Sequence, residues 1–264
     1  MPLSRYFIAS HEPGAPPPSA MVRAANFLLA LMALSLVFYI SFRHLAVALR
    51  WNAVYAYRGL FLKGWLTTLW ISALSLAVST LIGFCSALAQ RGPFLPLRYL
   101  AKIYVEVVRG TPLLVQILIF FYVIADAFGL SDRYVVGVLT LSFFSGAYIS
   151  EILRAGIESI GRTQLESAKA IGLTRAQTYR YVIFPQALRQ SLPPLAGQFA
   201  SLVKDSSLLS VISISEFTWS ARAVNSFTFG TLESYLPLAA GYLILTLPIS
   251  LWTRRLERLH RFET

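Results

Sequence analysis

The sequence predicts an all-α integral membrane protein. Of its 264 residues, 56% are apolar and only 13% are charged, which is too few charges for an ordinary soluble surface. The apolar residues gather in stretches long enough to cross about 30 Å of hydrocarbon as helices. The basic residues that give the chain its net charge of +11 gather in alternate connections between these stretches.

The chain begins with a proline-rich segment, HEPGAPPPSA at residues 11–20, which predicts a disordered tail over residues 1–20. The tail does not resemble a signal peptide. No internal repeat follows it, so the sequence gives no support to an inverted-repeat carrier. Six candidate spans lie at about 24–42, 65–90, 112–129, 134–153, 192–214 and 235–253.

The connections between spans differ in charge. Residues 91–111, residues 154–189 and the tail from Arg254 together hold fourteen Lys or Arg and five acids. The alternate connections, at 126–133 and 213–234, hold two basic residues and four acids. The positive-inside rule therefore places the first group, and with it the C-terminus, in the cytoplasm.

Residues 43–63 do not fit this scheme, because they hold four basic residues and no acid on the side that six spans would make external. Their segment RWNAVYAYRGLFLKGW mixes aromatic and basic residues. Two interpretations stay open: the segment lies along the membrane interface, or the first apolar stretch does not span.

A short helix is predicted at the start of the stretch LESAKAIGLTRAQTYRYVIFPQ, which occupies residues 165–186. Thr163 and Glu166 have the spacing of a capping box, so the helix is expected to begin at Gln164. It is expected to end at Gly172, since glycine readily adopts the left-handed conformation that closes a helix.

A second short helix is predicted directly after this turn. Thr174 and Gln177 repeat the capping-box spacing, so the helix is expected to run from Arg175 to about Phe184. Pro185 is expected to end it. Two helices around a glycine turn also suit a DNA-binding helix-turn-helix, but a DNA reader needs a soluble domain around it. Because candidate spans lie directly before and after the hairpin, nucleic-acid binding is excluded.

Two ion pairs are predicted near the basic connections: Glu106 with Arg109, and Glu151 with Arg154, each three residues apart on a helix. The segment holding the first pair is expected to be a short cytoplasmic helix. At its end, Thr111 suits a helix N-cap and Pro112 the first position of the next helix.

The sequence shows no cluster of residues that is typical of a catalytic or metal-binding site. His11, His44 and His260 are scattered, and the spans contain no carboxylate pair or metal-ligand cluster. The single Cys85 sits among apolar residues and is interpreted as packing or lipid-facing. No G-x-x-x-x-G-K-[ST] sequence occurs, so the chain holds no phosphate-binding loop, and we expect no cofactor and no enzyme activity in it.

The hairpin resembles the EAA loop of bacterial ABC-importer permeases, whose pattern is Glu-Ala-Ala, three residues, Gly, nine residues, then Ile-x-Leu-Pro. Three other stretches are similar to the polar amino acid (histidine/glutamine/arginine-type) permease family: VEVVRGTPLLVQ, GAYISEILRAGIESI and LPPLAGQFASLVKDSSLLSVISISE. The resemblance covers about residues 60–258. The positions that match the EAA pattern are Glu166, Ser167, Ala168, Gly172, Val182, Phe184 and Pro185, of which Ser167, Val182 and Phe184 depart from the strict consensus.

The resemblance implies a five-span permease core at residues 61–258, with the coupling hairpin at 163–185. Residues 21–60 would add an N-terminal apolar segment and an interfacial linker, and 259–264 would form the C-terminal tail. In the family the hairpin docks into a groove of a cytoplasmic ATP-binding subunit, which binds ATP and Mg. Glu166 would contact a basic residue of that subunit, and Gly172 would permit the turn.

The resemblance also implies the setting. The chain would work in the bacterial inner membrane as a multi-pass protein, with the hairpin and C-terminus in the cytoplasm. Two ATP-binding subunits would lie under a pair of permeases, either two copies or two related chains. An external solute-binding protein would deliver a polar amino acid or a close derivative.

Lys204 and Asp205 are charged residues inside the fifth candidate span, where each alone would cost about 2.5–3.5 kcal/mol. They are expected to face the bundle interior. Because neighbours on a helix point in different directions, each needs its own partner or the helix breaks there. With Ser206 and Ser207 they either line a substrate pathway or hold two permeases together, and Gln116 is a further candidate for the pathway.

Two rival functions remain at this stage: an ion-coupled secondary carrier and a membrane-embedded enzyme, neither with an ATPase partner. The missing catalytic clusters disfavour the enzyme. The coupling hairpin disfavours the carrier.

Overall fold

The computed structural model describes residues 19–43 and 49–260, which are almost entirely helical and contain no strand. The chain forms two units, residues 1–49 and 50–264. The first unit holds a single described helix, α2 (Ala20–Arg43), whose side chains are nearly all exposed. The predicted disordered tail lies, up to residue 18, outside the described residues.

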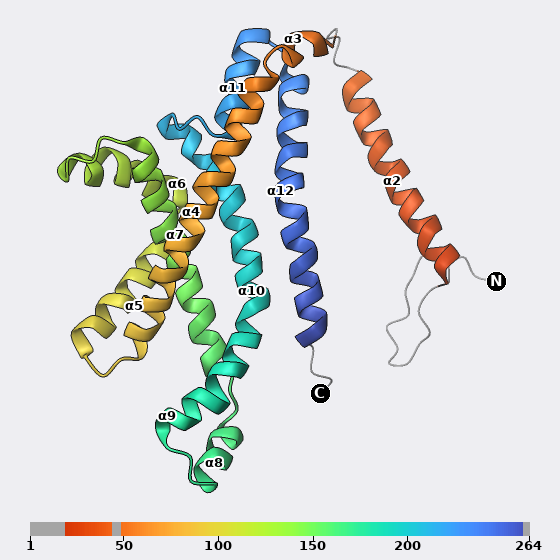
Figure 1. Ribbon diagram of the computed structural model, residues 1–264. Coiled ribbons are helices and arrows are strands. Elements are labelled where there is room, and N and C mark those ends of the chain that lie inside the picture. The colour runs from red at the N-terminus through yellow and green to blue at the C-terminus, as the bar shows by residue number, and fades with distance from the viewer. Residues whose placement is uncertain (1–18, 44–48, 261–264) are drawn as a thin grey trace. The chain divides into compact units, whose positions relative to one another are not determined.

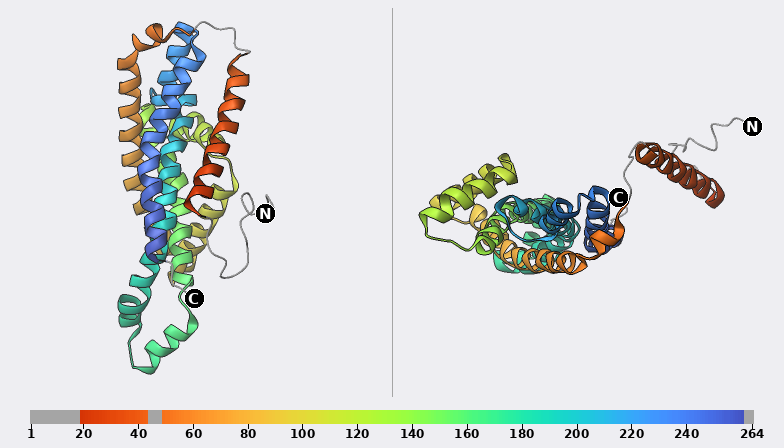
Figure 2. Two further views of the ribbon diagram at one scale, coloured as in Figure 1. Left: turned by 90° about the vertical axis from the view of Figure 1, so that its right-hand side faces the viewer. Right: turned by 90° about the horizontal axis from the view of Figure 1, so that it is seen from above.

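The second unit is a bundle in which α4, α10 and α12 run along one general direction (Figure 2). A hairpin projects at one end, and α3 and α11 lie at the other (Figure 1). Its elements are α3 (Trp51–Tyr55), α4 (Arg58–Arg91), α5 (Leu95–Gly110), α6 (Leu113–Ile119), the π-helix η1 (Phe120–Ala125), α7 (Arg133–Glu158), α8 (Arg162–Ala170), α9 (Arg175–Thr178), the π-helix η2 (Tyr179–Ile183), α10 (Phe184–Asp205), the 3-10 helix η3 (Ser206–Ile212), α11 (Phe217–Thr228) and α12 (Thr231–His260).

Small residues bring α4 and α7 together, and this pair has the most extensive contact in the bundle. Gly83 of α4 faces Ile149 of α7, and a Cβ at Gly83 would lie 2.7 Å from the Ile149 Cβ. Gly146 of α7 faces Ile82 in the same way. An apolar cluster beside this crossing joins α4, α6, α7, η3 and the segment after it through Ile71, Leu113, Ile117, Val138, Leu141, Leu209, Ile212 and Ile214.

Four described helices are long and apolar enough to cross a membrane: α2, α4, α7 and α12. The pair formed by α5 and the helical segment Leu113–Ala125 bends by 112° and counts as a fifth if it is one broken span. The fifth predicted span, at 192–214, falls on α10 and η3 and does not qualify. Its charged pair, Lys204 and Asp205, and the polar residues earlier in α10 lower its apolar character.

The bend between α5 and α6 corrects one sequence prediction. The N-cap of α6 is Pro112 rather than Thr111, and α6 begins at Leu113. The Thr111 hydroxyl donates to the Val107 carbonyl instead, at 2.8 Å. Proline without an N–H suits the cap position as well as the first turn, because neither needs its amide as a donor.

Candidate functional site

The hairpin is built from α8 and α9 around Gly172. This residue has φ +79°, the left-handed conformation that the sequence predicts. Its N–H donates to the Lys169 carbonyl at 3.1 Å, and the Leu173 N–H donates to the Ala168 carbonyl at 3.0 Å. A Cβ at Gly172 would have no atom within 4 Å. Backbone conformation, not space, therefore selects glycine at this turn.

Of the two predicted capping boxes, the second is confirmed. The Gln177 N–H donates to the Thr174 hydroxyl at 3.3 Å, and the Thr174 N–H donates to the Gln177 amide oxygen at 2.9 Å. The first is wrong: α8 begins at Arg162, after Gly161 and with no side-chain cap. The Gln164 N–H donates to the Gly161 carbonyl at 3.1 Å, so the backbone closes this turn by itself.

Pro185 does not end the second helix, contrary to the sequence prediction. The chain continues from α9 through η2 into α10, and Pro185 stands in the first turn of α10. Proline is tolerated in a first turn, because the N–H that it lacks would have no helical partner there. The π-helix η2 has a wider hydrogen-bond spacing than an α-helix, so a new α-helical first turn begins after it although the chain stays helical.

The predicted coupling residues lie on the hairpin and on the helix that leaves it. Glu166 and Ser167 are exposed and Ala168 is buried. Ser167, Ala168 and Val182 line a groove of about 350 Å³ together with Thr163, Gln164 and Ile171. Phe184 and Ile171 are exposed by 59% and 76%. The hairpin therefore presents an apolar surface with a groove, at the end of the bundle where nothing else of residues 50–260 covers it (Figure 1).

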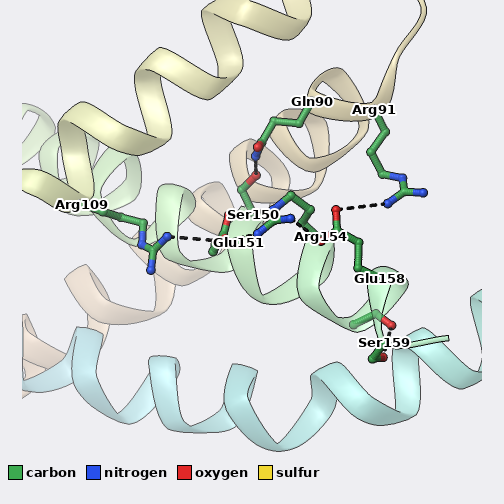
Figure 3. Close-up of polar contacts among 9 residues, drawn as sticks. Gln90, Arg91, Arg109, Ser150, Glu151, Arg154, Glu158 and Ser159 are labelled. Carbon is green, nitrogen blue, oxygen red and sulfur yellow. Dashed lines mark hydrogen bonds and ion pairs between the residues drawn. The ribbon is translucent and has the colours of Figure 1, made fainter. Parts of the chain in front are cut away.

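Above the hairpin, the end of α7 carries a charged cluster (Figure 3). Arg154 donates to Glu151 with Nε at 3.0 Å, as the sequence predicts, and pairs with Glu158 through Nη1. Arg109 at the end of α5 approaches Glu151 at 3.7 Å. It does not pair with Glu106, because its guanidinium lies over the Tyr148 ring of α7 at 5.5 Å.

Further polar contacts tie the same end of α7 to α4 and α10. The Gln90 amide of α4 donates to the Ser150 hydroxyl at 2.9 Å, and both side chains are buried. Arg91 of α4 approaches Glu158 at 3.7 Å. The Ser159 hydroxyl donates to the amide oxygen of Gln190 in α10. Near its C-terminal end, α7, the helix that leads into the hairpin, is thus joined to α4, α5 and α10.

The candidate pathway residues lie at the end of α10, where the helix becomes the 3-10 helix η3 directly after Asp205. Lys204 is exposed in this single chain, so the expectation that it faces the bundle interior is wrong for this residue, because neighbours on a helix point in different directions. Asp205 and Ser207 are half-buried, and Ser206 is buried. The Ser206 hydroxyl donates to the Val203 carbonyl at 2.8 Å. The sequence predicts either a separate partner for each of the adjacent Lys204 and Asp205 or a break in the helix, and the change to a 3-10 helix agrees with the second alternative. The substrate role of these residues stays a prediction.

Gln116 holds the corner between α5 and α6. It is buried, and its amide nitrogen donates to the Val108 carbonyl at 2.7 Å and to the Thr111 hydroxyl at 2.8 Å. These bonds satisfy carbonyl and hydroxyl groups at the end of α5. Gln116 therefore stabilises the corner between α5 and α6, and its role in a substrate pathway stays a prediction.

Glu216 is a buried residue that the sequence reasoning missed, having counted it only as an external acid. Its carboxylate accepts from the Thr218 and Trp219 N–H groups at 2.8 and 2.7 Å and caps α11. It also accepts from the Tyr242 hydroxyl at 3.0 Å. Burial raises the pKa of Glu216 to about 6. Its position directly before an amphipathic segment was the available signal for a cap.

Comparison with known proteins identifies the family. Residues 79–261 match the model of the family described as "binding-protein-dependent transport system inner membrane component". The glutamine transport system permease protein GlnP of Escherichia coli K12 is 39% identical over 210 residues, which are 79% of this chain and 96% of that protein. The L-cystine transport system permease protein TcyB of Bacillus subtilis is 38% identical over 193 residues, 72% of this chain and 82% of that protein.

Solved structures share the fold. A crystal structure of an amino acid ABC transporter with histidines is similar with a TM-score of 0.75 and 35% identity, covering 80% of this chain and 99% of that chain. The MetNI methionine ABC transporter in an inward-facing conformation is 16% identical with a TM-score of 0.62 over 76% and 96% of the two chains, and shows the fold alone. From the matched length and these identities, the chain belongs to the family of binding-protein-dependent transport system inner membrane components.

Proposed function

We propose that this chain is the membrane-spanning permease subunit of an ATP-binding-cassette importer for a polar amino acid or a close derivative. The observation that carries the proposal is the hairpin: two short helices around the left-handed Gly172, with an exposed apolar surface and a groove at one end of the bundle. Relatives named as glutamine and cystine permeases support an amino acid as the substrate class.

In this proposal, the work of the chain is conformational. A separate ATP-binding subunit holds ATP and Mg and receives the hairpin in a cleft. Closure of two such subunits moves the hairpin, and the spans alternate between outward and inward access. The complex includes a second permease, a copy or a related chain, and an external solute-binding protein. The hairpin and the C-terminus lie in the cytoplasm of a bacterial cell, as the basic connections indicate.

The substrate pathway is proposed to pass the end of α10. Lys204 and Asp205 supply opposite charges that suit the carboxylate and ammonium groups of an amino acid, with Ser206 and Ser207 beside them. The helix also changes from α10 to the 3-10 helix η3 at this point.

The test is to purify the chain from its own cells with its native partners and to measure ATP hydrolysis. We expect an ATP-binding subunit to co-purify, and Gly172→Pro to abolish coupled transport, because proline cannot adopt φ +79°. A parent protein that transports without any ATP-binding subunit would instead be a secondary carrier. Binding screens on the solute-binding protein would then identify the amino acid.

A further inference from the structure

The charged cluster at the end of α7 joins the helix that leads into the hairpin to α4 and α5. α8 makes its main contacts with α9 and η2 only. A displacement of α8 therefore reaches the bundle mainly through the chain connections of the hairpin, α7 before it and η2 with α10 after it. Of these, α7 is the helix that packs against α4 and α5.

Arg154 is the centre of this cluster (Figure 3). It holds two carboxylates, and each of them pairs with a cation of a different helix. Glu151 lies 3.7 Å from Arg109 of α5, and Glu158 lies 3.7 Å from Arg91 of α4. A guanidinium suits this task, since its planar fork binds two partners in fixed directions.

The stability of the fold does not explain the arrangement. The side chains of the three α7 residues are exposed by 23–49%, and ion pairs with such exposure contribute little to folding. The cluster also borders an open cavity of about 530 Å³ that holds further charges, among them Arg98 and Lys102 of α5. Neither of these two is within ion-pair distance of an acid in the described part of the chain.

We propose that Arg154 is a positioning residue of the transport cycle: by orienting Glu151 and Glu158, it passes the displacement of the hairpin from α7 to α5 and α4. When α7 moves, Arg109 and Arg91 follow their carboxylates, so the three helices shift together. Without Arg154, Glu151 and Glu158 lose their shared partner and turn toward solvent, away from Arg109 and Arg91. Less of the displacement of α7 then reaches α5 and α4. The inference rests on the proposed function, because it needs a hairpin that an ATPase displaces.

The experiment uses the full transporter in proteoliposomes, with its ATP-binding subunit and binding protein, and L-glutamine and L-histidine as the probe amino acids. We expect Arg154→Gln to lower the number of molecules taken up per ATP about tenfold, a typical size for the loss of a coupling contact. Co-purification of the ATP-binding subunit and hydrolysis without the binding protein are expected to stay at the parent's level. Arg154→Lys is expected to recover part of the loss, because an ammonium cannot bind both carboxylates as a fork does.

The matched control is Arg98→Gln, which removes the same charge from the same cavity without breaking an ion pair. It should keep uptake per ATP near the parent's value. A cycle of Arg91→Gln, Glu158→Gln and the double variant tests the connection to α4 in case Arg154→Gln fails to fold. We expect the second substitution to add little to the first.

Two results would overturn the inference while leaving the function intact: normal uptake per ATP in Arg154→Gln, or additive losses in the cycle. The failure of the proposed function looks different. In that case the parent itself shows no ATP-dependent uptake of either probe, and the inference falls with it.

Discussion

Gly172→Ala is the substitution that tests the hairpin most directly. The residue stands at φ +79°, where an L side chain costs about 1–2 kcal/mol relative to glycine. Since a Cβ there would meet no atom within 4 Å, no steric term adds to this cost. The free hairpin can relax the strain, because α8 contacts little beyond α9 and η2. Docking must restore the turn, so the cost appears in the affinity for the ATP-binding subunit.

At 1.4 kcal/mol for each factor of ten, this strain weakens docking about 5- to 30-fold. The assay is binding of the ATP-binding subunit to the permease in lipid nanodiscs. Gly129→Ala is the matched control, because Gly129 also has a positive φ, +66°, and also has no atom within 4 Å of a Cβ. It lies in the connection between η1 and α7, away from the hairpin (Figure 1).

We expect Gly129→Ala to bear a similar backbone cost, while its affinity for the ATP-binding subunit stays within about twofold of the parent's, as for distant, independent sites. Equal affinities for the parent and Gly172→Ala would refute the reasoning, since they would mean that docking does not require the left-handed turn.

Three further substitutions have expected outcomes. Gly83→Ala should destabilise the bundle by about 1–3 kcal/mol, because its Cβ would lie 2.7 Å from that of Ile149, and thermal unfolding in detergent measures the loss. Glu216 has a pKa raised to about 6 in the folded chain, so the folded state binds the proton more tightly than the unfolded state, and stability falls by about 2 kcal/mol as pH rises from 4.5 to beyond 6. Glu216→Gln should flatten that dependence in unfolding measured across the same range, and an unchanged slope would assign it to another group. Thr174→Ala removes the confirmed capping box and should cost about 1 kcal/mol locally, seen as faster amide exchange in α9 with unchanged exchange in α4.

The turn of the hairpin was predictable because its signals are local. Glycine at 172 and the Thr174–Gln177 pair act within a few residues, and both have the predicted conformation. The start of α8 and the passage through Pro185 were predicted wrongly. At the start of α8, the Gln164 N–H bonds to the Gly161 carbonyl and not to a side chain. Before Pro185, the chain forms the π-helix η2. Neither backbone feature can be recognised from the side chains in the sequence.

Ion-pair partners that lie far apart in the sequence were harder to predict. The pair Glu151–Arg154 lies within one helix and was predicted correctly, whereas Arg109 was assigned to Glu106 and lies instead against Glu151 and Tyr148 of α7. The choice depends on where α5 packs, and helix spacing alone contains no information about that.

By itself, the sequence determined that this is a helical membrane protein with a two-helix hairpin between two long helices. Apolar length, loop charge and turn residues are properties of neighbouring positions, and the membrane acts on them directly. Only the tertiary structure decided that the chain bends by 112° between α5 and the segment Leu113–Ala125, that Gln116 closes this corner, and that Glu216 is buried as a helix cap. These depend on packing between helices, where small residues such as Gly83 set how closely two backbones approach and which polar side chains are enclosed.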